Sequence, residues 1–260
     1  MFLQSHSAAR FAAVSVFIAA LFAPQVSSAL ESADELMRQV YEQGRIHKSQ
    51  RMNMEIRIKD SRGRKRVRFF KTLYLIDKKQ TKSLLRFYKP SDVKGTGLFN
   101  IVYDKKNKEN DQWIYFPAFR TVSKLGIEDK NDSFMGSDFT NADIAGRKPA
   151  EDTHTLLKAD EKNPVVSSVP RNSSDIYSKI ETHIISRVKV PEKIVFYDRS
   201  GKRLKTLTSK KIAKIEGMYV IVEAEMENHL TGGSTYLTKR EINFKKISSA
   251  EVSVAKLKNR

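Results

Sequence analysis

Few of the residues that perform chemistry in proteins stand at a useful spacing in this sequence. The chain has five histidines, which are scattered, and it has no cysteine. Cysteine nucleophiles, thiolate zinc sites and disulfide scaffolds are therefore excluded. Gly136-Ser137-Asp138 lacks the complete G-x-S-x-G pattern of a hydrolase nucleophile, and neither an H-E-x-x-H pair nor a P-loop is present. We therefore expect a protein that is not an enzyme and that has no metal site and no cofactor.

Two segments are rich in aromatic and methionine side chains, which suit the binding of an apolar ligand. Residues 113–119 are apolar on both faces of an expected strand and contain the only tryptophan. Residues 134–144 separate large apolar side chains by glycine and small polar residues. Such a cluster at a bend can line an adaptable pocket, and packing in the core is the alternative for each aromatic taken singly. The candidate cavity residues are Trp113, Tyr115, Phe116, Phe119, Phe134, Met135 and Phe139.

The second of these segments also contains a short structural motif, Gly136-Ser137-Asp138. Glycine allows a tight bend because it has no Cβ atom. Serine and aspartate are favoured N-caps of helices, so we expect Ser137 or Asp138 to cap the short helical turn that follows.

The N-terminal segment indicates export. Arg10 precedes a 13-residue apolar run, Phe11 to Ala23, after which Pro24 and Ser27-Ser28-Ala29 complete the pattern of a cleavable signal peptide. The run is shorter than the roughly 20 residues that a membrane-spanning helix needs, and a buried N-terminal helix is the alternative. We expect residues 1–29 to be a signal peptide and residues 30–260 to form a single domain. Because the chain has no cysteine, it also lacks the lipid-modified cysteine of a bacterial lipoprotein.

The chain is strongly basic, with 48 Lys and Arg against 30 Asp and Glu and a net charge of +18. Nucleic-acid binding predicts basic residues interleaved with aromatic residues on one face, whereas here the aromatic residues alternate with the charged ones. We therefore expect no nucleic-acid partner. A solvated outer face is the simplest explanation of the charge. For an exported protein, an anionic membrane surface is the alternative.

The spacing of apolar residues predicts a mainly β protein with a few helices. Ser32 and Glu35 form a capping box at the start of a helix that Gly44 ends. From residue 51 onward the apolar period changes from 3.6 to 2, and short strands alternate with polar turns. Residues 159–175 contain two prolines and are expected to be a long exposed loop. The pattern predicts a large antiparallel sheet curled into a sandwich or barrel. The expected strands are 51–59, 67–76, 83–89, 98–103, 112–116, 120–125, 154–158, 182–188, 193–197, 203–207, 210–215, 219–226 and 234–238.

Four blocks of the sequence resemble the bacterial outer-membrane lipoprotein-sorting proteins, a LolA-like group. The resemblance covers most of the chain from about residue 31 onward. Its most specific part is residues 133–139 together with residues 113–118. The blocks are residues 87–97 (FYKPSDVKGTG), residues 113–118 (WIYFPA), residues 133–139 (SFMGSDF), and Phe196-Tyr197-Asp198 with Gly201.

The resemblance implies an unclosed antiparallel β-barrel whose concave face is covered by helices. Such proteins are periplasmic carriers of acyl chains of lipoproteins or lipids between the inner and outer membranes. Members of this branch often accompany RND-type exporters of the inner membrane, which suggests such a transporter as a partner. A protein-only accessory subunit of such an exporter is the alternative function, and it predicts a filled concave face. An enzyme acting on lipid or glycan is a third hypothesis.

Overall fold

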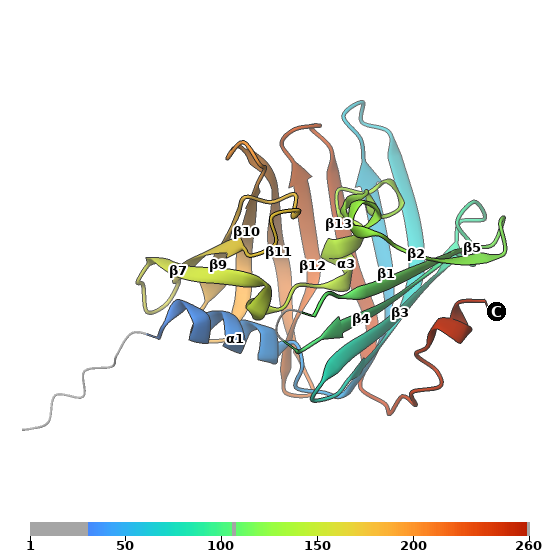
Figure 1. The fold of residues 1–260 in the computed structure, drawn as a ribbon, viewed down its shortest axis with the longest axis horizontal. Coiled ribbons are helices and arrows are strands. Elements are labelled where there is room, and N and C mark those ends of the chain that lie inside the picture. The colour runs from blue at the N-terminus through green and yellow to red at the C-terminus, as the bar shows by residue number, and fades with distance from the viewer. Residues whose placement is uncertain (1–30, 106–107, 259–260) are drawn as a thin grey trace, which may run out of the picture.

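The computed structural model describes residues 31–105 and 108–258, and a single antiparallel sheet of 13 strands dominates it (Figure 1). Strands that follow one another in the chain pair with each other, except β6 and β7, and β1 also pairs with β13. The edge strands β6 and β7 are not paired with each other in the described residues, so the curved sheet stays open. The strands are β1 (Ser49–Lys59), β2 (Lys65–Ile76), β3 (Gln80–Lys89), β4 (Gly97–Tyr103), β5 (Asp111–Phe116), β6 (Thr121–Lys124), β7 (Asp152–Lys158), β8 (Val165–Pro170), β9 (Lys179–Ile185), β10 (Val190–Tyr197), β11 (Arg203–Ile215), β12 (Met218–Asn228) and β13 (Ser234–Asn243).

The expected fold class is confirmed: the protein is mainly β, with one curved, unclosed sheet and few helices. Period-2 alternation explains the clearest strand, because Met52, Met54, Ile56 and Ile58 of β1 are all buried on one face. The helical elements are α1 (Ala33–Gln43), α2 (Ile127–Asn131), η1 (Phe134–Gly136), α3 (Asn141–Ala145), η2 (Pro149–Glu151) and η3 (Val254–Leu257). As predicted, Ser32 caps α1, and its side chain accepts a hydrogen bond from the Glu35 amide at 3.2 Å.

Three local predictions were wrong. Residues 159–175 are not one long loop, because they contain β8, whose Val166 pairs with Thr182 and is fully buried. Residues 203–215 form one continuous strand instead of two. The cap of the helix after Gly136 is Thr140, whose hydroxyl accepts from the Asp143 amide, and it is neither Ser137 nor Asp138. The prediction did place the bend correctly, since Gly136 has φ +73°.

The concave face of the sheet is covered by the segment from α2 to α3, residues 127–145 (Figure 1). Phe134 from this segment is buried against Phe70 of β2 and Phe87 of β3, with ring centroids 6.1 Å and 5.6 Å away. These rings belong to the largest hydrophobic cluster of the protein. Helix α1 lies at the β7 end of the sheet and contacts β7 and β10. The main core therefore lies between the concave face and its covering segment.

The outer face of the sheet carries a second hydrophobic cluster, which the C-terminal segment covers. Val252 and Leu257 of this segment are fully buried against β3, β4 and β5. An ion pair of 2.7 Å between Arg51 and Glu251 helps to hold the segment in place. Strand β5 is apolar on both faces because one face meets the core and the other meets this segment.

We predict that Val252→Asp lowers the free energy of unfolding by about 3 kcal/mol or more, because it places a carboxylate at a fully buried position. Chemical denaturation measures the effect. Ala255→Asp, at an exposed position of the same segment, is the matched control and should change stability by less than about 0.5 kcal/mol. Equal effects of the two substitutions would show that the segment does not pack on the sheet.

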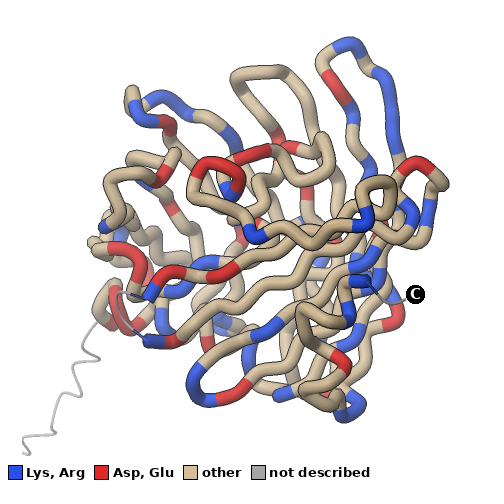
Figure 2. The backbone as a smooth tube through the Cα atoms, turned by 45° about the vertical axis from the view of Figure 1, so that its right-hand side comes forward, with Lys and Arg blue, Asp and Glu red and all other residues tan. Residues whose placement is uncertain are grey.

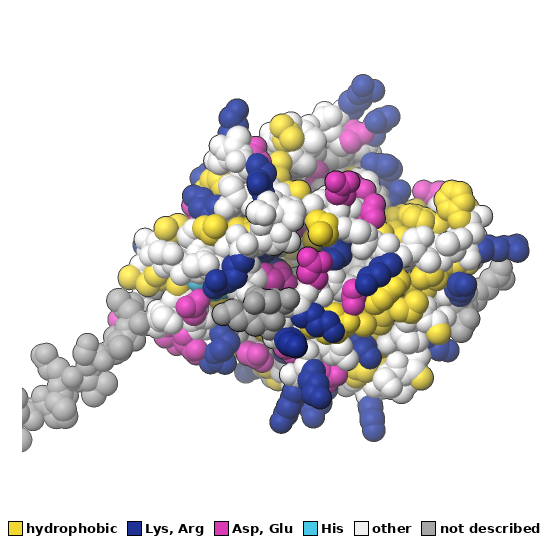
Figure 3. Space-filling view, in the orientation of Figure 1, with side chains coloured by type: hydrophobic (Ala, Val, Ile, Leu, Met, Phe, Trp, Pro, Cys, Tyr) yellow, Lys and Arg dark blue, Asp and Glu magenta, His cyan; other side chains and the backbone are white. Residues whose placement is uncertain are grey.

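Lys and Arg residues concentrate at the turns and strand ends, and their side chains project around the periphery of the molecule (Figures 2 and 3). The β1–β2 turn is an example, with Arg62, Arg64, Lys65 and Arg66 all exposed. In the described ranges, no helix is long and apolar enough to cross a membrane. The predicted signal peptide, residues 1–29, lies outside the described residues.

Candidate functional site

The seven candidate cavity residues lie in three different environments. Phe139 lines a cavity beneath the covering segment, whereas Phe134 and Met135 pack into the neighbouring core. Trp113 and Tyr115 point to the opposite face of the sheet, where the C-terminal segment covers them and the Trp113 ring lies 5.5 Å from Phe99.

The remaining two aromatic residues of the first segment are exposed. Phe116 ends β5, and Phe119 lies in the turn after it with 75% of its surface accessible. The two rings contact each other edge to face at 6.4 Å. Of the seven residues, the structure therefore places Phe139 alone in the cavity wall.

The cavity has a volume of about 600 Å³ and lies between α1, α3 and the strands β9 to β12. Its floor is apolar, because alternate residues of these strands turn toward the concave face. Sequence reasoning missed these floor residues, although they share period-2 alternation with β1. The apolar wall consists of Met37 and Val40 of α1, Phe139, and the strand residues Ile180, Ile194, Phe196, Leu207 and Met226.

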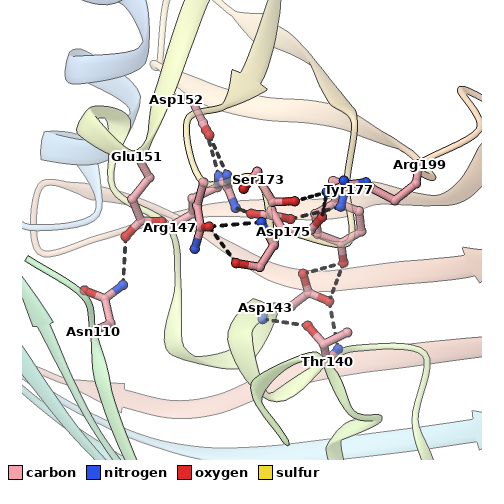
Figure 4. A network of polar contacts seen from close by, with 12 residues as sticks. Asn110, Thr140, Asp143, Arg147, Glu151, Asp152, Ser173, Asp175, Tyr177 and Arg199 are labelled. Carbon is pink, nitrogen blue, oxygen red and sulfur yellow. Dashed lines mark hydrogen bonds and ion pairs between the residues drawn. The ribbon is translucent and has the colours of Figure 1, made fainter. Parts of the chain in front are cut away.

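The opening of the cavity is polar, and some of its charges are paired (Figure 4). Arg147 lies between two carboxylates, with a nitrogen–oxygen distance of 2.5 Å to Asp152 and 2.7 Å to Asp175. Burial alone would lower the pKa of Arg147, but the two aspartates outweigh it and raise that pKa. Burial raises the pKa of Glu151, whose carboxylate accepts from the Asn110 amide at 2.7 Å. The opening therefore combines hydrogen-bonding groups with both paired and unpaired charges.

A second polar group fixes α3 to the sheet. The Lys205 ammonium of β11 lies 2.5 Å from the Asp143 carboxylate, and both side chains are nearly inaccessible. The Tyr177 hydroxyl donates to the same carboxylate at 2.9 Å (Figure 4). Burial, together with the charge of Asp143, raises the pKa of Tyr177, so this hydroxyl remains a donor at ordinary pH. These contacts hold α3, and with it Ala142 and Phe139, above the cavity floor.

Arg68 of β2 connects the concave face to the covering segment. Its buried guanidinium donates a hydrogen bond to the carbonyl oxygen of Met135. Met135 has φ +54°, a left-handed conformation that is uncommon for a residue with a side chain. The hydrogen bond therefore holds a strained turn against the sheet.

We predict that Arg68→Leu speeds amide hydrogen exchange in residues 134–137 by about tenfold or more, because a hydrogen bond to a charged group contributes roughly 1.5–3 kcal/mol. Exchange followed by mass spectrometry measures the effect. Arg62→Leu, in the exposed β1–β2 turn, removes the same charge and is the control. Equal exchange in the two variants would contradict the proposed role of Arg68.

The described residues contain no cluster of three or more His, Asp or Glu that could hold a metal ion. Of the four described histidines, His154 and His183 lie in strands and the other two in a bend and a turn. His154 bonds to Ser168 and to the Pro149 carbonyl. What the arrangement provides is an apolar cavity beneath a polar opening, which suits a ligand with an apolar chain and a polar end.

Comparisons with solved structures agree with this architecture. A domain from Vibrio parahaemolyticus, described as an outer membrane lipoprotein-sorting protein, is 26% identical, with a TM-score of 0.78 over 85% of this chain and 97% of that one. A family model described as an uncharacterized protein matches residues 79–259. The chain belongs to the family of that model, and its fold is that of the LolA-like lipoprotein-sorting proteins.

Two further structures share the LolA-like fold. A DUF1329 family protein from Desulfovibrio piger is 21% identical, with a TM-score of 0.80 over 87% of this chain and 99% of that one. A LolA superfamily protein from Nitrosomonas europaea is 18% identical, with a TM-score of 0.68 over 86% of this chain and 99% of that one. A search of the curated proteins gave no match.

Proposed function

We propose that this LolA-like protein is a carrier or chaperone that binds acyl chains of lipoproteins or lipids in its apolar cavity. The observation that carries the proposal is the cavity of about 600 Å³ beneath the covering segment. Ligand sites in proteins commonly have volumes of roughly 300–1,000 Å³. A concave face filled by side chains would instead have favoured the protein-only accessory subunit.

The energetics of acyl chains fit such a cavity. Transfer of one CH₂ group out of water is worth about 0.8 kcal/mol, so a C16 chain gains on the order of 10 kcal/mol. The apolar wall from Phe139 to Met226 supplies this environment without a catalytic group. The polar opening around Arg147 and Glu151 leaves the polar end of an amphiphile in contact with hydrogen-bonding groups and water.

The proposed site of action is the periplasm. Export by a signal peptide that is cleaved after Ala29 would deliver a carrier that is not lipid-anchored, able to move cargo between the inner and the outer membrane. The exposed Lys and Arg residues at the turns would favour transient contact with anionic membranes. The family resemblance adds an RND-type transporter of the inner membrane as a proposed partner.

Titration of the purified protein with a fluorescent acyl probe tests the carrier function. We expect saturable binding, an increase in probe emission on transfer from water, and competition by unlabelled palmitate. Binding should change little when the salt concentration rises, because screening acts on exposed charges more than on an apolar cavity. The absence of probe binding, combined with co-purification of a membrane protein, would instead support the accessory-subunit function.

A further inference from the structure

The turn between β5 and β6 presents two aromatic rings to the solvent. Phe119 exposes 75% of its surface and Phe116 exposes 38%. Neither ring belongs to a hydrophobic cluster of the described ranges. The turn is nevertheless well formed, because the backbone amides of Phe119 and Arg120 both donate to the Phe116 carbonyl, at 3.1 Å and 3.0 Å. The backbone therefore holds both rings, in edge-to-face contact, at a fixed place on the surface.

Two exposed cations lie at the same place. Arg120 ends the turn, and the β3–β4 loop, residues 90–96, lies beside the turn at the same end of the sheet (Figure 1). The two loops are in close contact, since a Cβ atom on Gly95 would lie 3.0 Å from the Cγ atom of Pro117. Lys94, next to Gly95 in the chain, is exposed. Neither Arg120 nor Lys94 makes an ion pair with a residue of the described ranges.

The local charge is positive because little negative charge opposes these cations. Residues 90–96 and 117–120 contain one acidic residue, Asp92, whose carboxylate lies 3.8 Å from the guanidinium of Arg68. Hydrophobic side chains reach the surface at this end of the molecule, with Lys and Arg side chains beside them (Figure 3). The two loops thus combine aromatic rings with uncompensated positive charge.

This combination fits a lipid surface better than a protein surface. A stable protein interface buries roughly 800 Å² on each partner, which is far more than two rings on a hairpin turn offer. A bilayer requires no surface of matching shape, because apolar side chains enter the boundary between headgroups and acyl chains. Anionic headgroups supply the charge that Lys94 and Arg120 lack as a partner.

We propose that residues 116–120, with the adjoining residues 90–96, form a surface that docks on anionic lipid bilayers. Phe116 and Phe119 enter the boundary of the acyl chains, and Lys94 and Arg120 contact the headgroups. The inference rests on the proposed carrier function, whose membrane contact it locates, but it requires neither the cavity nor its ligand. It gives the two aromatic residues that lie outside the cavity an apolar partner of their own.

Co-sedimentation with phosphatidylcholine vesicles, prepared with and without phosphatidylglycerol, tests the aromatic part of the surface. We expect the exported protein to bind the vesicles that contain phosphatidylglycerol. Phe119→Ser should weaken this binding by about tenfold, because the variant loses the transfer of a large apolar side chain out of water. Ile46→Ser is the control, since Ile46 is 52% exposed and precedes β1, at the opposite end of the strands from the β5–β6 turn. It should leave vesicle binding unchanged.

A second pair of variants tests the charges. Lys94→Gln/Arg120→Asn should weaken binding to the anionic vesicles by about tenfold or more, since a cation near an anionic surface contributes roughly fivefold in affinity. Lys78→Gln/Lys79→Gln removes the same net charge from the exposed β2–β3 turn, at the opposite end of the strands. This control should weaken binding by less than about twofold.

Three results would overturn the proposal. They are the absence of binding to phosphatidylglycerol vesicles, equal losses for substitutions at the two ends of the strands, and a loss of soluble acyl-probe binding in Phe119→Ser, which would assign the turn to the ligand site. Co-purification of a membrane protein that Phe119→Ser abolishes, without vesicle binding, would replace the lipid surface by a protein partner. Vesicle binding without uptake of the acyl probe would support the docking surface and contradict the carrier function.

Discussion

Replacement of Ala142 by tryptophan should lower the affinity for an acyl probe by about tenfold or more, because the indole fills space that the ligand needs. Ala142 lies in α3 and lines the cavity above its apolar floor. The residue is partly accessible, so the larger side chain can enter the cavity without displacing the packed core. The measurement is a probe titration, with the melting temperature recorded for each variant.

The control is Ala118→Trp, which adds the same side chain in the exposed turn between β5 and β6. This variant should bind the probe like the unmodified protein. Unchanged affinity in folded Ala142→Trp would mean that acyl chains do not occupy this cavity. A reduced affinity in both variants would point to a general effect of the added indole and would also contradict the assignment.

Asp143→Ala should lower the free energy of unfolding by about 3–5 kcal/mol, because it leaves the charge of Lys205 buried and unpaired. The exposed fractions of the two side chains are 3% for Lys205 and 10% for Asp143. The substitution also removes the acceptor of the Tyr177 hydroxyl. Because Asp143 lies in α3, we expect weaker acyl binding as well. Equilibrium unfolding in urea measures the loss of stability.

The double variant Asp143→Ala/Lys205→Met separates the cost of an unpaired charge from the value of the pair. It should recover most of the lost stability, because apolar replacement of a buried ion pair is often nearly neutral. Glu225→Ala breaks the more exposed Lys210–Glu225 pair and should cost less than about 1 kcal/mol. A loss for Asp143→Ala no larger than for Glu225→Ala would contradict the described role of the buried pair.

The fold could be predicted from the sequence because the alternation of apolar and polar residues that indicates a strand is a local pattern. The alternation of Met52, Met54, Ile56 and Ile58 with polar residues depends only on neighbours in the chain. Strand β8 was missed because it is short, lies between prolines and has a mixed composition, and its pairing with β9 outweighs those local signals. The family blocks then selected an unclosed barrel from the several architectures that many short strands allow.

The cavity could be predicted only in part, because its wall is assembled from residues as distant as Met37 and Met226. Residues 113–119 were predicted to line a ligand cavity because both faces of the expected strand are apolar. The structure explains this composition by two layers of packing, the concave core and the C-terminal segment. Sequence alone could not tell these two buried faces apart.

The sequence also contained a signal for inward-facing lysines, namely their position on the apolar face of a strand, that the prediction did not use. Lys205 stands two positions from Leu207, and Lys239 two positions from Leu237, so each lysine shares a strand face with an apolar residue. Strict alternation places such a lysine toward the core. Composition instead favoured a solvated outer face for the charges as a group. Whether an inward lysine meets a carboxylate, as Lys205 does, depends on contacts between distant segments.

The central claim, that the protein carries acyl chains, is tested most directly by the molecules that it retains after purification. Protein isolated under gentle conditions without detergent would be extracted with organic solvent, and the extract analysed by lipid mass spectrometry. The account predicts near-stoichiometric acyl-containing lipid in the extract of the unmodified protein, and a strongly reduced amount in that of Ala142→Trp. Lipid-free unmodified protein that also fails to take up an added acyl probe would contradict it.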